Sequence, residues 1–181
     1  MSTTAGAAVA AATFVALYAG HQVGDHVIQS HAQASAKGAP TGAGAHPWTG
    51  WPACLRHVAS YGLVQAAALG LVCLVAPLRW GGVVAALAVS TGTHAVIDRR
   101  WPVRLIIRAK GCQDWPEAPY LIDQSLHAGA LLVAAVAAAA VTGPVTAAAV
   151  AAGAVGLVGA ALAVERWGAV TAGGPVAGAS A

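Results

Sequence analysis

The chain has 181 residues, of which 58% are hydrophobic and only 8% are charged, and its mean hydropathy is +0.70. These values exclude an ordinary soluble domain and are typical of a polytopic membrane protein. The formal net charge of +3 is better explained by membrane topology than by a nucleic-acid partner, and we expect no such partner.

Five apolar segments are long enough to cross a bilayer, which takes about 20 residues of helix. We expect these spans at residues 4–29, 53–76, 82–98, 120–141 and 145–164, within a single domain covering 1–181. Residues 30–52 are polar and rich in Gly, Ala and Ser, and the helix breakers within residues 37–48 predict a loop there. Residues 99–110 are too charged to cross and predict a short interfacial helix. The predicted fold class is therefore an all-α polytopic transmembrane helix bundle of four to five spans with a cytoplasmic interfacial helix.

The distribution of Lys and Arg predicts the orientation. Five of the nine basic residues lie between the third and fourth spans: Arg99, Arg100, Arg104, Arg108 and Lys110. Cytoplasmic loops are enriched in these residues, so this segment should be cytoplasmic. The chain is then a multi-pass protein of the bacterial inner membrane, with its N-terminus outside and its C-terminus in the cytoplasm.

Three aspartates in these apolar segments each have a histidine four residues away, a spacing that puts both side chains on one helix face. An ionisable residue in the bilayer core costs about 3 kcal/mol on insertion scales, so such residues usually have a function. With one further histidine of the second span, the predicted topology brings all of them to one depth in the cytoplasmic leaflet: His21, Asp25, His57, His94, Asp98, Asp123 and His127.

Four histidines and three carboxylates are ligands suited to a divalent transition metal. We expect zinc first, with manganese or iron as alternatives, and one or two ions because seven candidates exceed one tetrahedral shell. The remainder would orient the ligands, and Asp25, Asp98 or Asp123 would handle a proton as catalytic residue. The alternative is that each pair is a hydrogen-bonded or ionic clasp that assembles the bundle.

Polar residues next to these pairs are candidates for substrate binding. Gln29 lies one turn beyond the first pair, and Gln124 lies inside the third. In the basic segment, Arg100, Arg104 and Arg108 recur at every fourth residue. These arginines could contact anionic lipid head groups or hold a phosphate, and they could equally serve only to fix the topology.

Three other features have more than one interpretation. Tyr61 and Gln65 share a helix face with His57, so they could line a cavity or bond between helices. His26 is rotated away from the aspartate of its own segment and is expected to be solvated. The fifth span has no ionisable residue, and its glycines favour close packing within the chain or in a homo-oligomer: Gly153, Gly156 and Gly159.

At these residues the chain resembles the uncharacterised bacterial membrane family called domain-of-unknown-function family 3307. That family carries H-x-x-x-D followed by a Gln, a His in the second helix, H-x-x-x-D ending the third helix and D-Q-x-x-H opening the fourth. The resemblance covers about residues 20–132 and matches His21, Asp25, Gln29, His57, His94, Asp98, Asp123, Gln124 and His127. It implies the fold and the site, but it implies no established reaction.

We therefore expect a membrane-embedded, metal-dependent hydrolase that acts on a lipid-like or phosphorylated substrate, with membrane lipids as partners. One alternative is a metal-ion or proton-coupled transporter, which would need a polar path through the almost wholly apolar outer halves of the spans. The other alternative is a non-enzymatic membrane accessory protein in which the His/Asp pairs are structural clasps.

Overall fold

The computed structural model describes residues 3–39, 46 and 48–172, and it has no strand among them. Five helices are long and apolar enough to cross a membrane: Thr3–Ile28, Trp51–Val75, Trp80–Asp98, Ala118–Ala140 and Pro144–Trp167. The largest difference from the predicted limits is three residues, at the end of the last span (164 expected, Trp167 observed). The all-α, multi-pass bundle is therefore confirmed.

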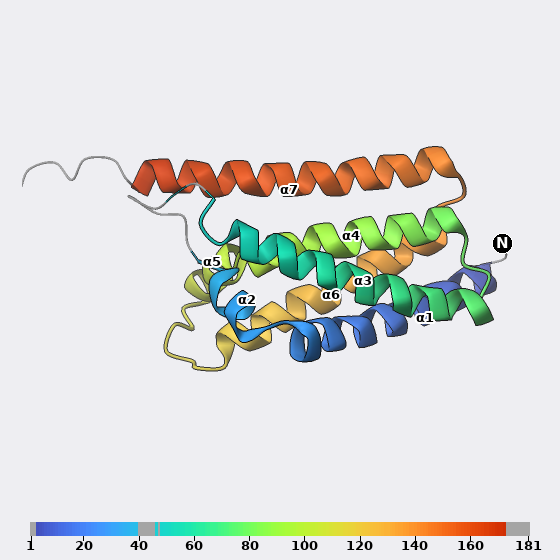
Figure 1. Ribbon diagram of the computed structural model, residues 1–181, viewed down its shortest axis with the longest axis horizontal. Helices are drawn as coiled ribbons and strands as arrows, with labels where there is room; N and C mark the ends of the chain where they lie inside the picture. The colour runs from blue at the N-terminus through green and yellow to red at the C-terminus, as the bar shows by residue number, and fades with distance from the viewer. Residues whose placement is uncertain (1–2, 40–45, 47, 173–181) are drawn as a thin grey trace, which may run out of the picture.

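Four of the long helices form a bundle, and the fifth packs on its outside. The bundle helices are α1 (Thr3–Val23, continued by the π-helical turn η1, Gly24–Ile28), α3 (Trp51–Val75), α4 (Trp80–Asp98) and α6 (Ala118–Ala140). Helix α7 (Pro144–Ala172) lies along α4 (Figure 1). Two short helices cover the same end of the bundle: α2 (His31–Ala36) and α5 (Trp101–Lys110).

Proline and glycine set several helix limits. A proline occupies the first turn of α3, of α5 and of α6, where its missing N–H leaves no intrahelical bond unmade. Gly50, before α3, has a φ of 80°, a left-handed conformation that favours glycine. A side chain at Gly50 would also collide with the guanidinium of Arg99, so this position requires glycine twice over.

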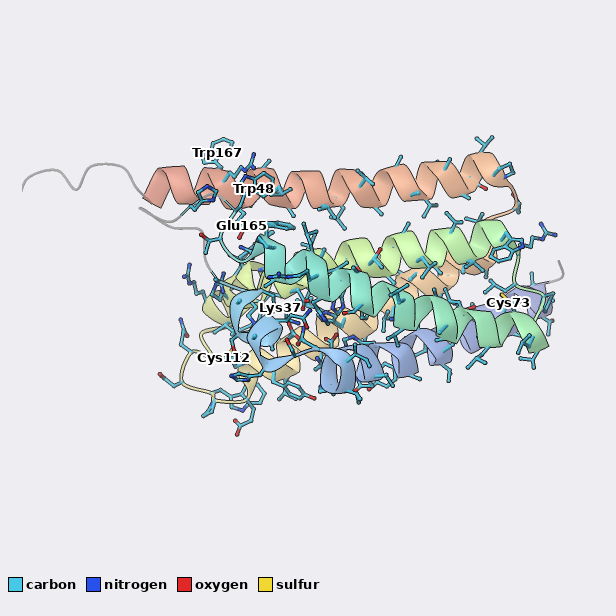
Figure 2. The ribbon with its side chains drawn as sticks, in the orientation of Figure 1. Lys37, Trp48, Cys73, Cys112, Glu165 and Trp167 are labelled. Atoms are coloured by element: carbon cyan, nitrogen blue, oxygen red, sulfur yellow. The ribbon has the colours of Figure 1, made fainter. Side chains whose placement is uncertain are left out.

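The two ends of the bundle differ in polarity. The half away from α2 and α5 holds an apolar cluster built around Leu17, Leu69 and Leu131, with alanines of α4 and α6 between them. These small side chains allow close approach, and the Cα of Gly82 lies against the backbone carbonyl of Ala138. The buried ionisable side chains lie in the other half, beneath α2 and α5, where Figure 2 labels Lys37.

The stretch between the first two spans contains a short helix, α2, that was not predicted, and most of the loop expected over residues 37–48 lies outside the described residues. Ser30 Oγ accepts from the backbone N–H of Gln33 at 3.2 Å, and the Gln33 side chain accepts from the backbone N–H of Ser30 at 2.9 Å. This reciprocal capping box stabilises a helix of only six residues. As a result Lys37, which follows α2, is buried at 5% exposure.

The last helix is also longer than expected, and it carries an ionisable residue that contacts the bundle. Glu165 of α7 accepts from Arg99 Nε at 3.1 Å and from Arg99 Nη2 at 2.6 Å. Arg99 is fully buried and donates further to the carbonyls of Lys37, Ala39 and Thr49. This arginine therefore joins α7, the end of α4 and the segment around α2.

Candidate metal centre

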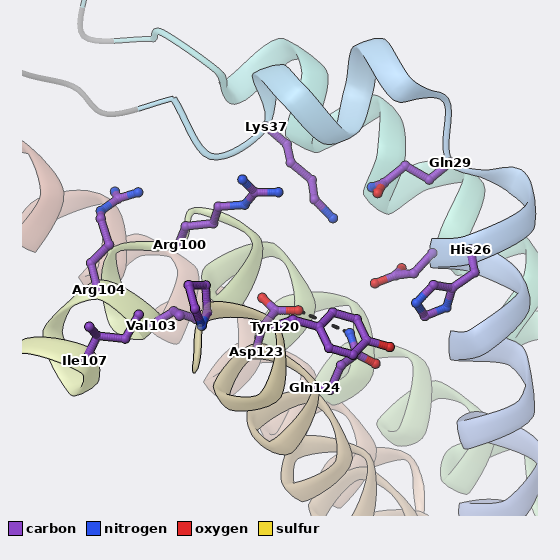
Figure 3. Close-up of a pocket in the computed structure, with 12 residues that line it drawn as sticks. His26, Gln29, Lys37, Arg100, Val103, Arg104, Ile107, Tyr120, Asp123 and Gln124 are labelled. Atoms are coloured by element: carbon purple, nitrogen blue, oxygen red, sulfur yellow. Dashed lines mark hydrogen bonds between the residues drawn. The ribbon is translucent and has the colours of Figure 1, made fainter. Parts of the chain in front are cut away.

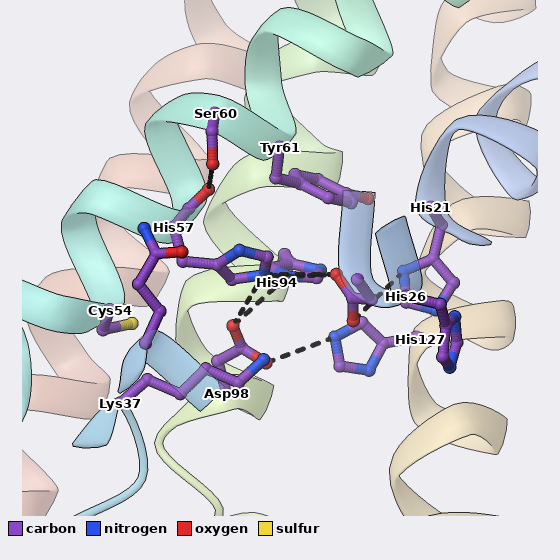
Figure 4. Close-up of polar contacts among 12 residues, drawn as sticks. His21, His26, Lys37, Cys54, His57, Ser60, Tyr61, His94, Asp98 and His127 are labelled. Carbon is purple, nitrogen blue, oxygen red and sulfur yellow. Dashed lines mark hydrogen bonds and ion pairs between the residues drawn. The ribbon is translucent and has the colours of Figure 1, made fainter. Parts of the chain in front are cut away.

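Six of the seven predicted ligand side chains converge at one end of the bundle, from four different spans (Figure 4). None of the six side chains is more than 8% exposed: His21, Asp25, His57, His94, Asp98 and His127. They form two overlapping groups that could each hold a metal ion, with one ligand atom per residue and all atoms within 4.8 Å of one another. The two groups share Asp25 and His94.

The π-helical turn η1 determines where Asp25 points. Such a turn contains one residue more than an α-helical turn, and π-turns often occur at functional sites. Gly24 packs so closely on α3 that a Cβ there would lie 2.9 Å from Cδ2 of Tyr61. This close approach brings the Asp25 carboxylate to His57 of α3, with Oδ1 3.1 Å from Nε2.

The first group, which we call the tetrad, consists of Asp25, His57, His94 and Asp98. His57 Nε2 lies 3.0 Å from His94 Nε2 and 3.4 Å from Asp98 Oδ2. His94 Nε2 lies 3.4 Å from Asp25 Oδ1 and 3.2 Å from Asp98 Oδ2. Zinc bonded to four such ligands at about 2.0–2.1 Å would separate the ligand atoms by about 3.3 Å, and five of the six separations in the tetrad, at 3.0–3.4 Å, fit such a shell.

Polar side chains on the apolar side of the tetrad are used in interhelical hydrogen bonds. The hydroxyls of Tyr61 and Ser90 lie 2.8 Å apart, and Gln65 donates to the Tyr61 hydroxyl and to the carbonyl of Leu17. The Tyr61 ring stacks on His94 with 3.8 Å between ring centroids. Of the two interpretations of this polar stripe, bonding between helices is the one observed, and it fixes the His94 ring.

The second group consists of His21, Asp25, His94 and His127. The His21 and His127 rings stack with 4.7 Å between centroids. His127 Nδ1 lies 2.9 Å from the backbone carbonyl of Asp123, and His21 Nε2 lies 3.3 Å from Oε1 of Gln124. Because both contacts place a ring N–H against an oxygen acceptor, they assign the lone pairs to His21 Nδ1 and His127 Nε2.

Lys37 also joins the site. Its Nζ lies 2.7 Å from Oδ1 of Asp98, the carboxylate oxygen that does not face the tetrad histidines. Lys37 is thus a site residue that the sequence analysis missed. The one available signal was the S-x-x-Q pattern of Ser30 and Gln33, which predicts a helix start immediately before it.

A pocket of about 520 Å³ opens beside this cluster (Figure 3). Its polar lining includes all four predicted substrate-binding residues, Gln29, Gln124, Arg100 and Arg104, together with Asp25, Lys37 and Asp123. Val103, Ile107 and Tyr120 form apolar parts of its wall. His26 is exposed, as expected, yet it also lines the pocket. The pocket therefore combines three cationic side chains with two carboxylates and an apolar wall.

Asp123 differs from the other two aspartates. It lies in the second turn of α6, its side chain is 23% exposed, and it belongs to neither ligand group. Its Oδ2 accepts from Gln124 Nε2 at 3.2 Å. The carboxylate thus faces the pocket, while the backbone carbonyl of the same residue orients His127.

The shortest contacts in the cluster run between helices. Within the pairs, His21–Asp25 and Asp123–His127 are separated by 3.7 Å and His94–Asp98 by 3.2 Å. The contacts of His57 with α4 and with η1 are 3.0 and 3.1 Å. The cluster is therefore joined between helices, and it is not a set of separate clasps that each hold one His/Asp pair.

Fold and cluster together define a multi-pass membrane protein with a buried His/Asp centre beneath one end of its helix bundle. The chain belongs to the family described as protein of unknown function (DUF3307), whose family model matches residues 13–152. This is the family that the motifs indicate; the match contains all nine motif residues but ends before Glu165. No curated protein and no solved structure matches the chain.

Proposed function

We propose that the protein is a membrane-embedded, metal-dependent hydrolase that acts on a lipid-like or phosphorylated substrate at the cytoplasmic leaflet. The observation that carries this proposal is the position of the pocket: it brings Lys37, Arg100 and Arg104 next to the ligand cluster. Cations beside a metal site suit a substrate whose negative charge grows during the reaction.

The proposed roles follow from where each side chain lies. The His/Asp cluster would hold the metal, which would supply a Lewis acid and lower the pKa of a bound water. Asp123 would accept the proton of that water, because it is the aspartate that faces the pocket without entering a ligand group. Gln29 would donate to a substrate oxygen, since its buried Nε2 has no hydrogen-bond partner among the described residues.

The two arginines are already oriented for an anion. Arg100 donates to the carbonyl of Ala34 at 3.2 Å, and Arg104 donates to the carbonyl of Gly38 at 3.4 Å. A guanidinium has five N–H donors, so each arginine keeps donors for a phosphate. The apolar wall at Val103, Ile107 and Tyr120 would accept the first carbons of a lipid chain.

The surroundings of the cluster favour this function over the alternatives. The bonded polar residues Tyr61 and Gln65 are followed along the bundle by the apolar cluster at Leu17, Leu69 and Leu131, which interrupts a polar path for an ion. A purely structural role would favour a fully bonded cluster, whereas Asp98 Oδ2 and both lone-pair nitrogens of the second group have no hydrogen-bond partner in the described part of the chain.

We also propose the bacterial inner membrane as the location, with the centre on the cytoplasmic side. The basic segment 99–110 lies at the same end of the bundle as the centre, and such segments face the cytoplasm. A homo-oligomer would form through α7, where a Cβ added to any of three glycines meets no atom within 4 Å: Gly153, Gly156 and Gly159.

The test is phosphate release by purified protein in lipid vesicles supplied with Zn²⁺ or Mn²⁺. Vesicles that contain phosphatidic acid present a phosphorylated lipid, and a soluble aryl phosphate presents the same bond without the chain. We expect hydrolysis by the wild type and a fall of about 100-fold for Asp123→Asn, the size typical of a lost general base. Asp114→Asn, an exposed aspartate outside the pocket, is the matched control. Release of phosphate from neither substrate by protein that has bound metal would refute the proposal.

A further inference from the structure

We infer that a second metal position lies beside the tetrad, made by His21, His127 and the outer oxygen of Asp25. The Asp25 carboxylate would then bridge two ions, and the centre would be dinuclear. The inference deepens the proposed function and rests on it for the first ion.

The two oxygens of Asp25 face different partners. Oδ1 lies 3.1 Å from His57 and 3.4 Å from His94, inside the tetrad. Oδ2 lies 3.7 Å from Nδ1 of His21, outside it. A carboxylate with one oxygen toward each set of ligands has the geometry that bridges two cations.

Two further ligand atoms face the same space. The hydrogen bonds of His21 to Gln124 and of His127 to the Asp123 carbonyl use one nitrogen of each ring. The other nitrogens, His21 Nδ1 and His127 Nε2, are buried and have no hydrogen-bond partner among the described residues. Both rings are therefore held in the tautomer that metal binding requires.

The tetrad and this position share His94, and with His94 Nε2 bound to the first ion the second position would keep three protein ligands and one vacant place. His94 directs Nε2 to the tetrad, where it approaches His57 and both carboxylates. The outer oxygen of Asp98 is 3.8 Å from His127 Nε2, but Lys37 is 2.7 Å from that oxygen. Three protein ligands with one vacant position are typical of catalytic zinc, whereas four protein ligands are typical of structural zinc.

The vacant position lies on the pocket side of the cluster. Asp123 and Gln124 both line the pocket and both contact the histidines of the second position. A phosphoester in the pocket would thus meet the open ion, while the tetrad holds the closed one. Paired ions about 3.5–4 Å apart stabilise both the attacking and the leaving oxygen when a phosphoester is displaced at phosphorus. The chemical class of substrate that we assign to this centre is therefore a phosphoester.

The second position should bind its ion more weakly than the tetrad. His21 Nδ1 and Asp25 Oδ2, two of its ligand atoms, are 3.7 Å apart. The tetrad contacts are 3.0–3.4 Å, so they need no movement. Closing the second group would require side-chain shifts, which lowers its affinity.

The experiment is a titration of metal-free protein in detergent with Mn²⁺, followed by metal content and by electron paramagnetic resonance. We expect two ions per chain in two steps, and an exchange-coupled signal once the second step is filled. The double variant His21→Gln/His127→Gln should retain one ion with an uncoupled signal. His31→Gln/His46→Gln, which changes two exposed histidines outside both groups and outside the pocket, should retain two.

The outcomes separate the two proposals. A single ion in saturated wild type, an uncoupled signal at two ions, or two ions in the double variant would each overturn the second position and leave the hydrolase standing. No ion in the wild type would overturn both. If the double variant lost all metal through misfolding, the coupled or uncoupled signal of the wild type would still decide.

Discussion

Two buried polar clusters lie at the same end of this bundle, and their hydrogen bonding differs. Around Arg99, the guanidinium donates to Glu165 and to three backbone carbonyls, and it also lies 5.0 Å from the ring of Trp51. In the His/Asp cluster, four ring nitrogens and one carboxylate oxygen have no hydrogen-bond partner among the described residues: His21 Nδ1, His57 Nδ1, His94 Nδ1, His127 Nε2 and Asp98 Oδ2.

Burying a polar group without a partner costs free energy, so a cluster that only stabilises a fold is normally saturated with hydrogen bonds. The Arg99 cluster meets that description, and the His/Asp cluster does not. The difference indicates that the first cluster holds the helices together and that the second is built for something that binds. Mutations should therefore separate stability from metal binding.

The largest expected effect is on metal affinity. His94 belongs to both ligand groups, so His94→Ala should lower affinity by more than about 100-fold, beyond the 10–100-fold typical of losing an outer partner. Isothermal titration with Zn²⁺ of detergent-solubilised protein measures this. His31→Ala, an exposed histidine, is the control. Equal affinity in all three proteins would show that these ligands hold no metal.

The next effect is on stability alone. Glu165→Gln removes the carboxylate from a fully buried arginine, and breaking a buried ion pair costs about 3–5 kcal/mol. Chemical unfolding in detergent micelles should show this loss, while the metal content of the folded protein stays that of the wild type. Glu117→Gln, at an exposed residue, should change neither. A loss of metal in Glu165→Gln without a loss of stability would reverse the roles given to the two clusters.

A third effect links metal affinity to stability through mass action. Metal that binds only the folded chain stabilises it by about 2.7 kcal/mol when its free concentration is 100 times Kd. Chelation should therefore lower the Tm of the wild type and leave the Tm of His94→Ala unchanged. The scans are run with and without a chelator at one protein concentration. An equal fall in both proteins would mean that the chelator acts elsewhere.

The sequence predicted most of the fold because hydropathy alone specifies the spans. It also predicted which residues meet, because a spacing of four and a common depth are properties of the chain order. The assignment of the aspartates could not be predicted: Asp25 and Asp98 enter the tetrad and Asp123 faces the pocket. That division depends on the rotation of each helix and on the π-helical turn at Asp25.

The contacts between distant segments could not be predicted from the sequence either. Arg99 and Glu165 are 66 residues apart, and no local pattern pairs them. Arg99 reads as one more charge of the basic segment, which sets topology in any membrane protein. Lys37 reads as part of a small-residue loop, because the helix that returns it to the bundle has only six residues.

Lys37 belongs to both clusters, and it gives the smallest and most specific test. Its backbone carbonyl accepts from Arg99, whereas its ammonium pairs with Asp98 in the tetrad. In metal-free protein this ammonium partly neutralises the carboxylates, and a bound cation would do the same. Lys37→Met should therefore destabilise the metal-free protein more than the metal-bound protein, because an unpaired buried carboxylate is costly only while no other cation is present.

The stabilisation by metal should accordingly be larger in Lys37→Met than in the wild type. We expect a difference of about 1 kcal/mol, because one ammonium competes only weakly with the metal for Asp98. Differential scanning with and without Zn²⁺ at one fixed excess measures it. Lys110→Met, at an exposed lysine at the end of α5, should keep the wild-type increment. If Lys37→Met also kept the wild-type increment, Lys37 and the metal would not share Asp98. The assignment of one Asp98 oxygen to Lys37 and the other to the metal would then be wrong.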